Sequence, residues 1–128
     1  MTKLRILILE DDALIGELLS EMLVEMGHCV CAIAATEAGA VAAAAHSSPE
    51  LIVADAWLGS GTGLSAVDRI CALHPVPCLF VTGDVARITD LRPCAVVIQK
   101  PFREVDLVTG MQRAINAHNT HQSAHPSA

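Results

Sequence analysis

Aromatic and basic residues are both scarce in this chain of 128 residues, which has one tryptophan, two phenylalanines and no tyrosine. Eight lysines and arginines stand against fourteen aspartates and glutamates, so the formal net charge is −6. A protein that binds nucleic acid needs clustered positive charge to meet the phosphates. The composition therefore argues against a nucleic-acid partner.

Long apolar runs are missing as well, although 52% of the residues are hydrophobic. Much of this fraction is alanine, and the longest unbroken apolar run, Cys29–Ala35, has seven residues. A membrane span needs about 20. The N-terminus leads directly into acidic residues, which is not the pattern of a secretory signal. We therefore expect a cytoplasmic protein with no membrane contact.

Paired cysteine motifs are absent too. The cysteines are odd in number, lack CxxC spacing and lie in mostly apolar segments. Such spacing favours neither a disulfide framework nor a zinc site, and free cysteine often acts as a small hydrophobic core residue. We expect reduced, buried thiols at Cys29, Cys31, Cys71, Cys78 and Cys94.

What the chain does contain is an alternation of short apolar runs with segments of helical periodicity. Such runs are typical of strands covered on both faces. Their alternation with helices predicts an α/β fold, a doubly wound five-stranded parallel sheet flanked by helices. The expected strands are Leu4–Leu9, Cys29–Ala34, Leu51–Asp55, Cys78–Thr82 and Ala95–Gln99. The expected helices are Ala13–Met26, an alanine-rich helix capped by Thr36 that runs to about Ser47, Leu64–Leu73 and Glu104–Ala117.

The first helix, the fourth helix and the tail carry more specific expectations. Asp12 should cap the first helix and Gly27 should end it. Residues 84–93 leave room for only about two helical turns, so the fourth helix should be short or irregular. The domain should span 1–118, followed by a polar, disordered tail at 119–128. The apolar face of the first helix is expected to comprise Leu14, Leu18, Met22 and Met26, widened by Ile15, Leu19 and Leu23.

Charged and hydroxyl residues follow four of the five apolar runs. Glu10 and Asp11 come after the first run, and Asp55 ends the third. Thr82 ends the fourth run and Lys100 follows the fifth. The carboxyl ends of parallel strands converge on one crevice, where two like charges about 4 Å apart repel by roughly 4 kcal/mol. A cluster of carboxylates therefore needs a cation, and Mg2+ is the oxygen-preferring ion that commonly serves phosphate chemistry.

Each of these residues has an ordinary structural explanation when taken alone. An acidic residue before a helix is often an N-cap, which is the role we assign to Asp12. A lone lysine such as Lys100 is usually solvated, and a β-branched residue such as Thr82 suits a strand. Only their joint position at strand ends favours a functional site.

With Gly63 and Pro101 added, this ordered set resembles the receiver domain of bacterial two-component response regulators over almost the whole chain. The resemblance implies a flavodoxin-like fold and identifies Asp55 as the phosphoacceptor. It also implies a cis bond between Lys100 and Pro101. The implied metal ligands are Glu10, mainly through water, Asp11 directly, Asp55, and the backbone carbonyl of Trp57. Lys100 would neutralise a phosphoryl oxygen and Thr82 would supply a hydroxyl to the phosphoryl group.

The same resemblance implies partners. A sensor histidine kinase or a histidine phosphotransfer protein would donate the phosphoryl group, and a downstream protein would read the result. The segment Pro77–Gly83 is similar to a subgroup whose fourth strand reads Pro-Phe-x-Phe-Ala-Thr-Gly, with Cys78 and Val81 as departures. Members of that subgroup often stand alone and work with HWE-type kinases in general-stress phosphorelays. Such a protein is a phosphorelay signalling component, not an enzyme beyond its own phosphotransfer and dephosphorylation.

The sequence departs from the receiver pattern at two places. Val97 stands where most receivers carry an aromatic residue, so the usual ring movement cannot operate. Gly59 replaces a common proline in a loop that also contains Gly61 and Gly63. Glycines in a loop raise the entropy cost of ordering it. We therefore expect metal and phosphate to order this loop and the short fourth helix.

Two other readings remain open from the residues alone. A small flavodoxin-like phosphohydrolase could use Asp55 as a nucleophile, although such an enzyme usually needs a lid to exclude water. A pseudo-receiver that works without phosphorylation is disfavoured by the intact acidic set. Next to the site, Trp57 either packs at the surface or controls water access, and Asp84 either tunes hydrolysis or caps the short helix.

Overall fold

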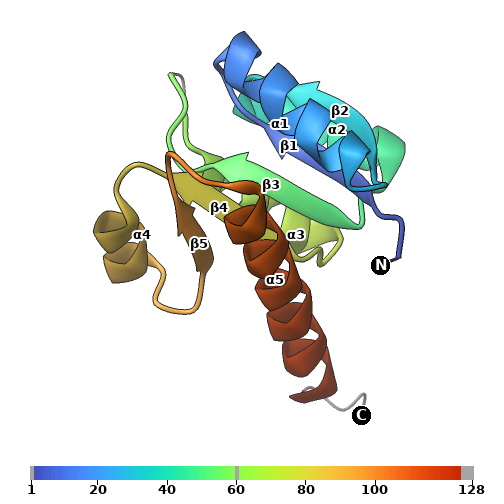
Figure 1. The fold of residues 1–128 in the computed structure, drawn as a ribbon. Coiled ribbons are helices and arrows are strands. Elements are labelled where there is room, and N and C mark those ends of the chain that lie inside the picture. Colours follow the sequence, from blue (N-terminus) through green and yellow to red (C-terminus); the bar gives the residue numbers. More distant parts are fainter. Residues whose placement is uncertain (1, 60, 125–128) are drawn as a thin grey trace.

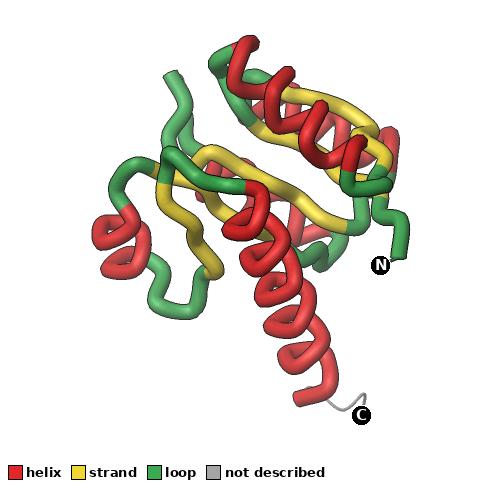
Figure 2. The backbone as a smooth tube through the Cα atoms, viewed as in Figure 1, coloured by secondary structure: helices red, strands yellow, loops and turns green. Residues whose placement is uncertain are grey.

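The computed structural model describes residues 2–59 and 61–124, and its five parallel strands form one sheet in the order β2-β1-β3-β4-β5. Strands and helices alternate along the chain, and helices cover both faces of the sheet (Figures 1 and 2). The expected doubly wound α/β fold is confirmed. The strands are β1 Arg5–Leu9, β2 Cys29–Ala34, β3 Leu51–Asp55, β4 Cys78–Thr82 and β5 Val96–Gln99. The helices are α1 Ala13–Glu25, α2 Glu37–Ser47, α3 Gly63–Leu73, α4 Val85–Leu91 and α5 Glu104–Ala124.

The sheet separates two apolar cores, because successive side chains on a strand point to opposite faces. In β1, Leu7 and Leu9 join the core beneath α2, α3 and α4. Ile6 and Ile8 join the core beneath α1 and α5. All four side chains are fully buried, and each contributes about 1.5–3 kcal/mol by burial. Burial on both faces explains why β1 is apolar at every position after Arg5.

Helix α1 begins where expected, but only part of its expected apolar face packs against the sheet. Asp12 caps it, since its side chain accepts hydrogen bonds from the first-turn amides, and Gly27 follows its end at φ +95°. Leu14 and Leu18, expected in the core, are 68% and 51% exposed. The helix instead packs through Gly16, Leu19 and Leu23. Gly16 permits close approach to β2, because a Cβ there would lie 3.1 Å from Ile33 Cγ2.

The fourth helix is short, as expected, whereas the C-terminal segment is more helical than expected. Helix α4 has seven residues. Helix α5 continues past Ala117 to Ala124, so residues 119–124 are helical and not disordered as expected. No glycine or proline interrupts the chain between Met111 and Ala124, so nothing in this segment forces the helix to end. The rest of the expected tail, 125–128, lies outside the described residues.

The cysteines are free thiols, but they are less buried than expected. Cys29 and Cys94 are exposed, and the other three are half-buried. Cys29 begins β2, which lies at an edge of the sheet, and Cys94 lies in the loop before β5. No helix in the described ranges is both long enough and apolar enough to cross a membrane.

One buried polar residue ties the start of β1 to the start of β2. His28 is 4% exposed, and its Nδ1 accepts a hydrogen bond of 3.1 Å from the Leu4 backbone N–H. Nε2 has no hydrogen-bond partner among the described residues. A proton on Nδ1 would face the Leu4 donor, so this position suits a neutral imidazole. Burial lowers the pKa of His28 accordingly.

This lowered pKa predicts a loss of stability in mild acid. Below about pH 6.5 the unfolded imidazole takes up a proton that the folded protein resists. The free energy of unfolding should therefore fall as the pH drops from about 6.5 toward the lower folded pKa. Urea unfolding at pH 7.5 and 5.5 should show a smaller loss in His28→Asn, which keeps an acceptor but does not titrate. The same pH slope in both proteins would contradict the assignment.

Candidate functional site

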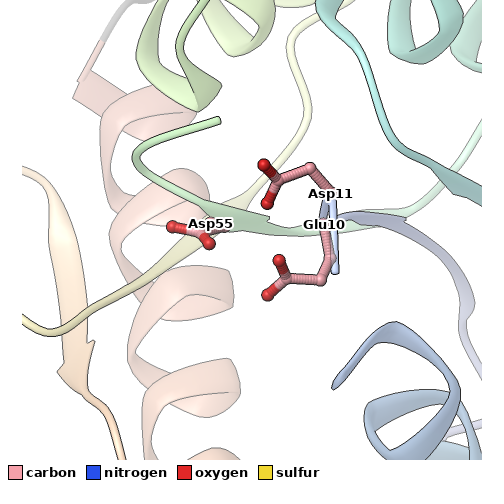
Figure 3. A group of neighbouring side chains, drawn as sticks. All are labelled: Glu10, Asp11 and Asp55. Atoms are coloured by element: carbon pink, nitrogen blue, oxygen red, sulfur yellow. The ribbon is translucent and has the colours of Figure 1, made fainter. Parts of the chain in front are cut away.

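The acidic residues meet at the carboxyl edge of the sheet, where β1 and β3 lie side by side. The chain passes from β1 to β2 on one side and later to β3 on the other, so this is the point where the strand order reverses. Such switch points form the ligand crevice of open α/β sheets. The carboxyl groups of Glu10, Asp11 and Asp55 lie close together there (Figure 3). One oxygen from each lies within 4.8 Å of the others.

Lys100 joins two of these carboxylates from the end of β5. Its Nζ lies 3.0 Å from Glu10 Oε1 and 2.9 Å from Asp55 Oδ2. The Lys100 backbone N–H donates to Thr82 O at 2.8 Å, which fixes the residue beside β4. The bond between Lys100 and Pro101 is cis, as the resemblance implied. The structure thus gathers four of the expected site residues into one cluster.

Burial and charge act in opposite directions on this cluster. Burial raises the pKa of Glu10, although the Asp12 backbone N–H and Lys100 both favour its ionised form. Burial alone would lower the pKa of Lys100, but its bonds to Asp55 and Glu10 outweigh this and raise the pKa. Lys100 therefore stays charged. With all groups ionised, three carboxylates face one ammonium, and two negative charges remain to be balanced.

The loop between β3 and α3 supplies a hydrogen bond that the sequence did not reveal. The Gly59 backbone N–H donates to Asp11 Oδ2 at 2.8 Å. A Cβ at position 59 would lie 3.2 Å from the same oxygen. A proline, which often occupies this place in receivers, has no N–H to donate. The departure at Gly59 therefore has a structural use, which is to hold the Asp11 carboxylate.

Trp57 holds the phosphoacceptor candidate from the same loop. Its backbone N–H donates to Asp55 Oδ1 at 3.0 Å. Trp57 also forms an isolated antiparallel bridge with Thr62 at the other end of the loop. The indole ring is half-buried, and the guanidinium of Arg87 lies 4.0 Å from its centroid. Sequence reasoning missed Arg87, because a basic residue on a short helix has no distinctive spacing.

Thr82 lies at the same edge of the sheet, but its hydroxyl is hydrogen-bonded to the segment before α4 and not to the acidic cluster. Its side chain is buried, and its Oγ1 accepts a hydrogen bond of 3.1 Å from the Asp84 backbone N–H. Asp84 in turn caps α4 by accepting from the Arg87 N–H. Of the two roles considered for Asp84, the structure shows the cap. Thr82 therefore connects the site edge to the start of α4.

The residues at this edge fit a hard divalent cation. Three carboxylate groups offer oxygen ligands within a small space, and Mg2+ is bound through oxygen. The two uncompensated negative charges also favour a cation of charge two. A structural Zn2+ would require nitrogen or sulfur ligands, and none belongs to this group of residues.

The fold and the site together define a class of protein: a doubly wound α/β domain with a carboxylate cluster and a lysine at its switch point. The response regulator receiver domain family matches residues 6–112, and the chain belongs to this family. The receiver domain expected from the sequence is therefore confirmed.

Three relatives illustrate the match. The phyllosphere-induced regulator PhyR of Methylorubrum extorquens is 37% identical over 114 residues, which cover 86% of this chain and 43% of PhyR. The transcriptional regulatory protein PdtaR of Mycobacterium tuberculosis is 31% identical over 117 residues, covering 88% of this chain and 57% of PdtaR. The solution structure of the Erythrobacter litoralis PhyR receiver domain superposes with a TM-score of 0.83 at 32% identity, covering 100% and 98% of the two chains. The chain thus spans about half the length of the two full-length regulators.

These findings bear on the function class. The chain is a receiver domain homologous to the regulators PhyR and PdtaR, and the phosphohydrolase alternative is not favoured.

The backbone geometry at Asp55 predicts a strict requirement for glycine at position 63. A Cβ there would lie only 1.9 Å from the Asp55 carbonyl oxygen, so Gly63→Ala must displace the site backbone. We expect the free energy of unfolding to fall by about 1–3 kcal/mol. Gly83→Ala is the matched control, since a Cβ there meets nothing within 4 Å. Equal stabilities of the two variants in urea unfolding would contradict the prediction.

Proposed function

We propose that Asp55 accepts a phosphoryl group from the phosphohistidine of a sensor kinase or phosphotransfer protein, in a reaction that depends on Mg2+. One observation carries the proposal. The Asp55 carboxylate lies 2.9 Å from the Lys100 ammonium and shares the switch-point crevice with Glu10 and Asp11. This arrangement provides a nucleophile and charge neutralisation in the same place.

The chemical step is a transfer between two partners. A carboxylate oxygen of Asp55 attacks phosphorus, the bond from phosphorus to the imidazole nitrogen breaks, and its electron pair stays with the donor's histidine. The product on this chain is an acyl phosphate. Phosphoryl transfer needs positioning and neutralisation of charge on three equatorial oxygens. The Trp57 N–H orients Asp55 through Oδ1, and Lys100 supplies one positive charge.

Two further groups would complete the site. Glu10, Asp11, Asp55 and the Trp57 carbonyl would hold Mg2+, which when bound supplies the remaining positive charge for the phosphoryl oxygens. The Thr82 hydroxyl would donate a hydrogen bond to the phosphoryl group. A hydroxyl has one donor and two acceptor positions, so Thr82 can do this and still accept from Asp84.

The partners follow from the same proposal. The resemblance of Pro77–Gly83 to the subgroup with a Pro-Phe-x-Phe-Ala-Thr-Gly fourth strand supports an HWE-type kinase as the donor. The similarity to a PhyR stress response regulator supports a general-stress phosphorelay as the setting. Output would be the binding of a downstream protein. The low content of basic residues supports a protein over a nucleic acid as the direct target.

Phosphorylation of Asp55 can be tested directly. Incubation with acetyl phosphate and Mg2+ should add the mass of one phosphoryl group to the parent protein, because the nucleophile and its counter-charges are already in place. Asp55→Asn should gain nothing, since an amide is a poor nucleophile, and chelation with EDTA should suppress the gain in the parent. Mass spectrometry of the intact protein reads both results.

An exposed aspartate provides the control. Asp90→Asn, on the outer side of α4, should be phosphorylated like the parent. A parent protein without an adduct, or an adduct that persists in Asp55→Asn, would refute the proposal. Rapid turnover of p-nitrophenyl phosphate would instead favour the phosphohydrolase.

A further inference from the structure

A contact between Arg87 and Trp57 connects the acidic site to helix α4. The Arg87 guanidinium lies over the indole ring, 4.0 Å from its centroid. Trp57 follows Asp55 by two residues, whereas Arg87 belongs to α4. Arginine over an aromatic face is an attractive arrangement. The contact therefore joins two elements that lie far apart along the chain.

This contact completes a chain of interactions along the edge of the sheet. On one side, the Trp57 N–H donates to Asp55 Oδ1. On the other side, the Arg87 N–H donates to Asp84 Oδ1, and the Asp84 N–H donates to Thr82 Oγ1. Every step is a direct contact, with hydrogen-bond distances of 3.0 to 3.1 Å. The phosphoacceptor candidate and the hydroxyl at the end of β4 are thus connected through the first turn of α4.

Arg87 is the polar group that holds the indole ring. Trp57 Nε1 is buried and has no hydrogen-bond partner among the described residues. Within the same part of the chain, no carboxylate forms an ion pair with Arg87. The guanidinium is therefore directed at the ring and not at a competing anion.

Helix α4 is so short that a single tertiary contact can contribute appreciably to its stability. It has seven residues, and helices shorter than about 12 residues are marginal without tertiary contacts. Its other anchors are the buried Ile88, the Asp84 cap, and a two-bond pair from Arg92 to Asp68 at 2.7 and 2.9 Å. The contact of Arg87 with Trp57 adds a direct link to the loop that follows Asp55.

We propose that Arg87 is a positioning residue that couples α4 to the phosphoryl and Mg2+ site through the Trp57 ring. The inference rests on the proposed function, because its ligands are those of the Asp55 site. Stacking holds Trp57, and the Trp57 backbone in turn orients Asp55. Coupling between two sites is reciprocal. Ligands that order the loop after β3 therefore also order α4. Loss of Arg87 lowers the affinity of the Asp55 site for these ligands.

Two measurements on the intact chain test the coupling. The first is Mg2+ affinity by calorimetry, which we expect Arg87→Ala to weaken by about two- to fivefold. The second is amide exchange in α4, followed at the Arg92 N–H, which donates to Ile88 O at 2.7 Å. In the parent, Mg2+ with beryllofluoride should slow this exchange, and in Arg87→Ala the response should disappear.

Two variants separate coupling from simple loss of helix stability. Arg87→Lys keeps a cation over the ring and should retain part of both effects. Arg92→Ala removes the pair with Asp68 at the other end of α4. Arg92→Ala should speed amide exchange in α4 both with and without ligands. It should leave unchanged the Mg2+ affinity and the factor by which Mg2+ with beryllofluoride slows this exchange. Trp57 is the single tryptophan, so acrylamide quenching of its fluorescence gives an independent signal, which should rise in Arg87→Ala and not in Arg92→Ala.

The outcomes distinguish this inference from the proposed function. The coupling would be overturned if Arg87→Ala kept the Mg2+ affinity of the parent and the same ligand-induced slowing of amide exchange in α4. It would also be overturned if amide exchange in α4 of the parent did not change on addition of Mg2+ and beryllofluoride. Arg87→Ala should still gain a phosphoryl group on Asp55. A parent that gains none would overturn the proposed function, while the Mg2+ titration would still report on the coupling.

Discussion

The Lys100 ammonium, held between the carboxylates of Glu10 and Asp55, is the interaction on which the site depends. These partners lie 90 and 45 residues from Lys100 along the chain, so the bonds draw together the ends of β1, β3 and β5. Without a cation, the buried carboxylate of Glu10 would have no counter-charge, and an uncompensated buried charge is strongly destabilising. The same bonds that stabilise the edge of the sheet leave Asp55 beside a positive charge. Structural and chemical roles therefore coincide at one lysine.

The loop after β3 and the start of α3 are tied to three neighbouring segments. Asp11 accepts from the Gly59 amide, and Arg87 lies over Trp57. Glu37 of α2 accepts from Ser65 Oγ at 2.6 Å at the start of α3, a bond that lowers the pKa of Glu37. The three glycines were expected to loosen this loop, but each also permits a close approach. At Gly61, with φ +79°, a Cβ would lie 2.8 Å from Glu37 Oε2, and at Gly63 it would meet Asp55.

These ties suggest how the domain signals with a valine at position 97. The short helix α4 depends on few anchors, and the first of them, the Asp84 cap, begins two residues after Thr82. A structural change at Thr82, at the end of β4, therefore directly affects the cap at the start of α4. Contacts of this kind can take the place of a moving aromatic ring, since they act at the helix start and not on the outer face of β5.

The sequence by itself determined the strands, the parallel sheet and the set of residues at its carboxyl edge. Each of these follows from local information: apolar runs of strand length, helix caps such as Asp12, and polar residues at the point where a run stops. The tertiary structure decided what depends on partners distant in the chain. It buried Leu19 and Leu23 of α1 and exposed Leu14 and Leu18, because β2 approaches the helix at Gly16. It also placed Arg87 on Trp57 and the Gly59 amide on Asp11, contacts that have no signature in sequence because no periodicity or spacing relates residues 30 or 48 positions apart.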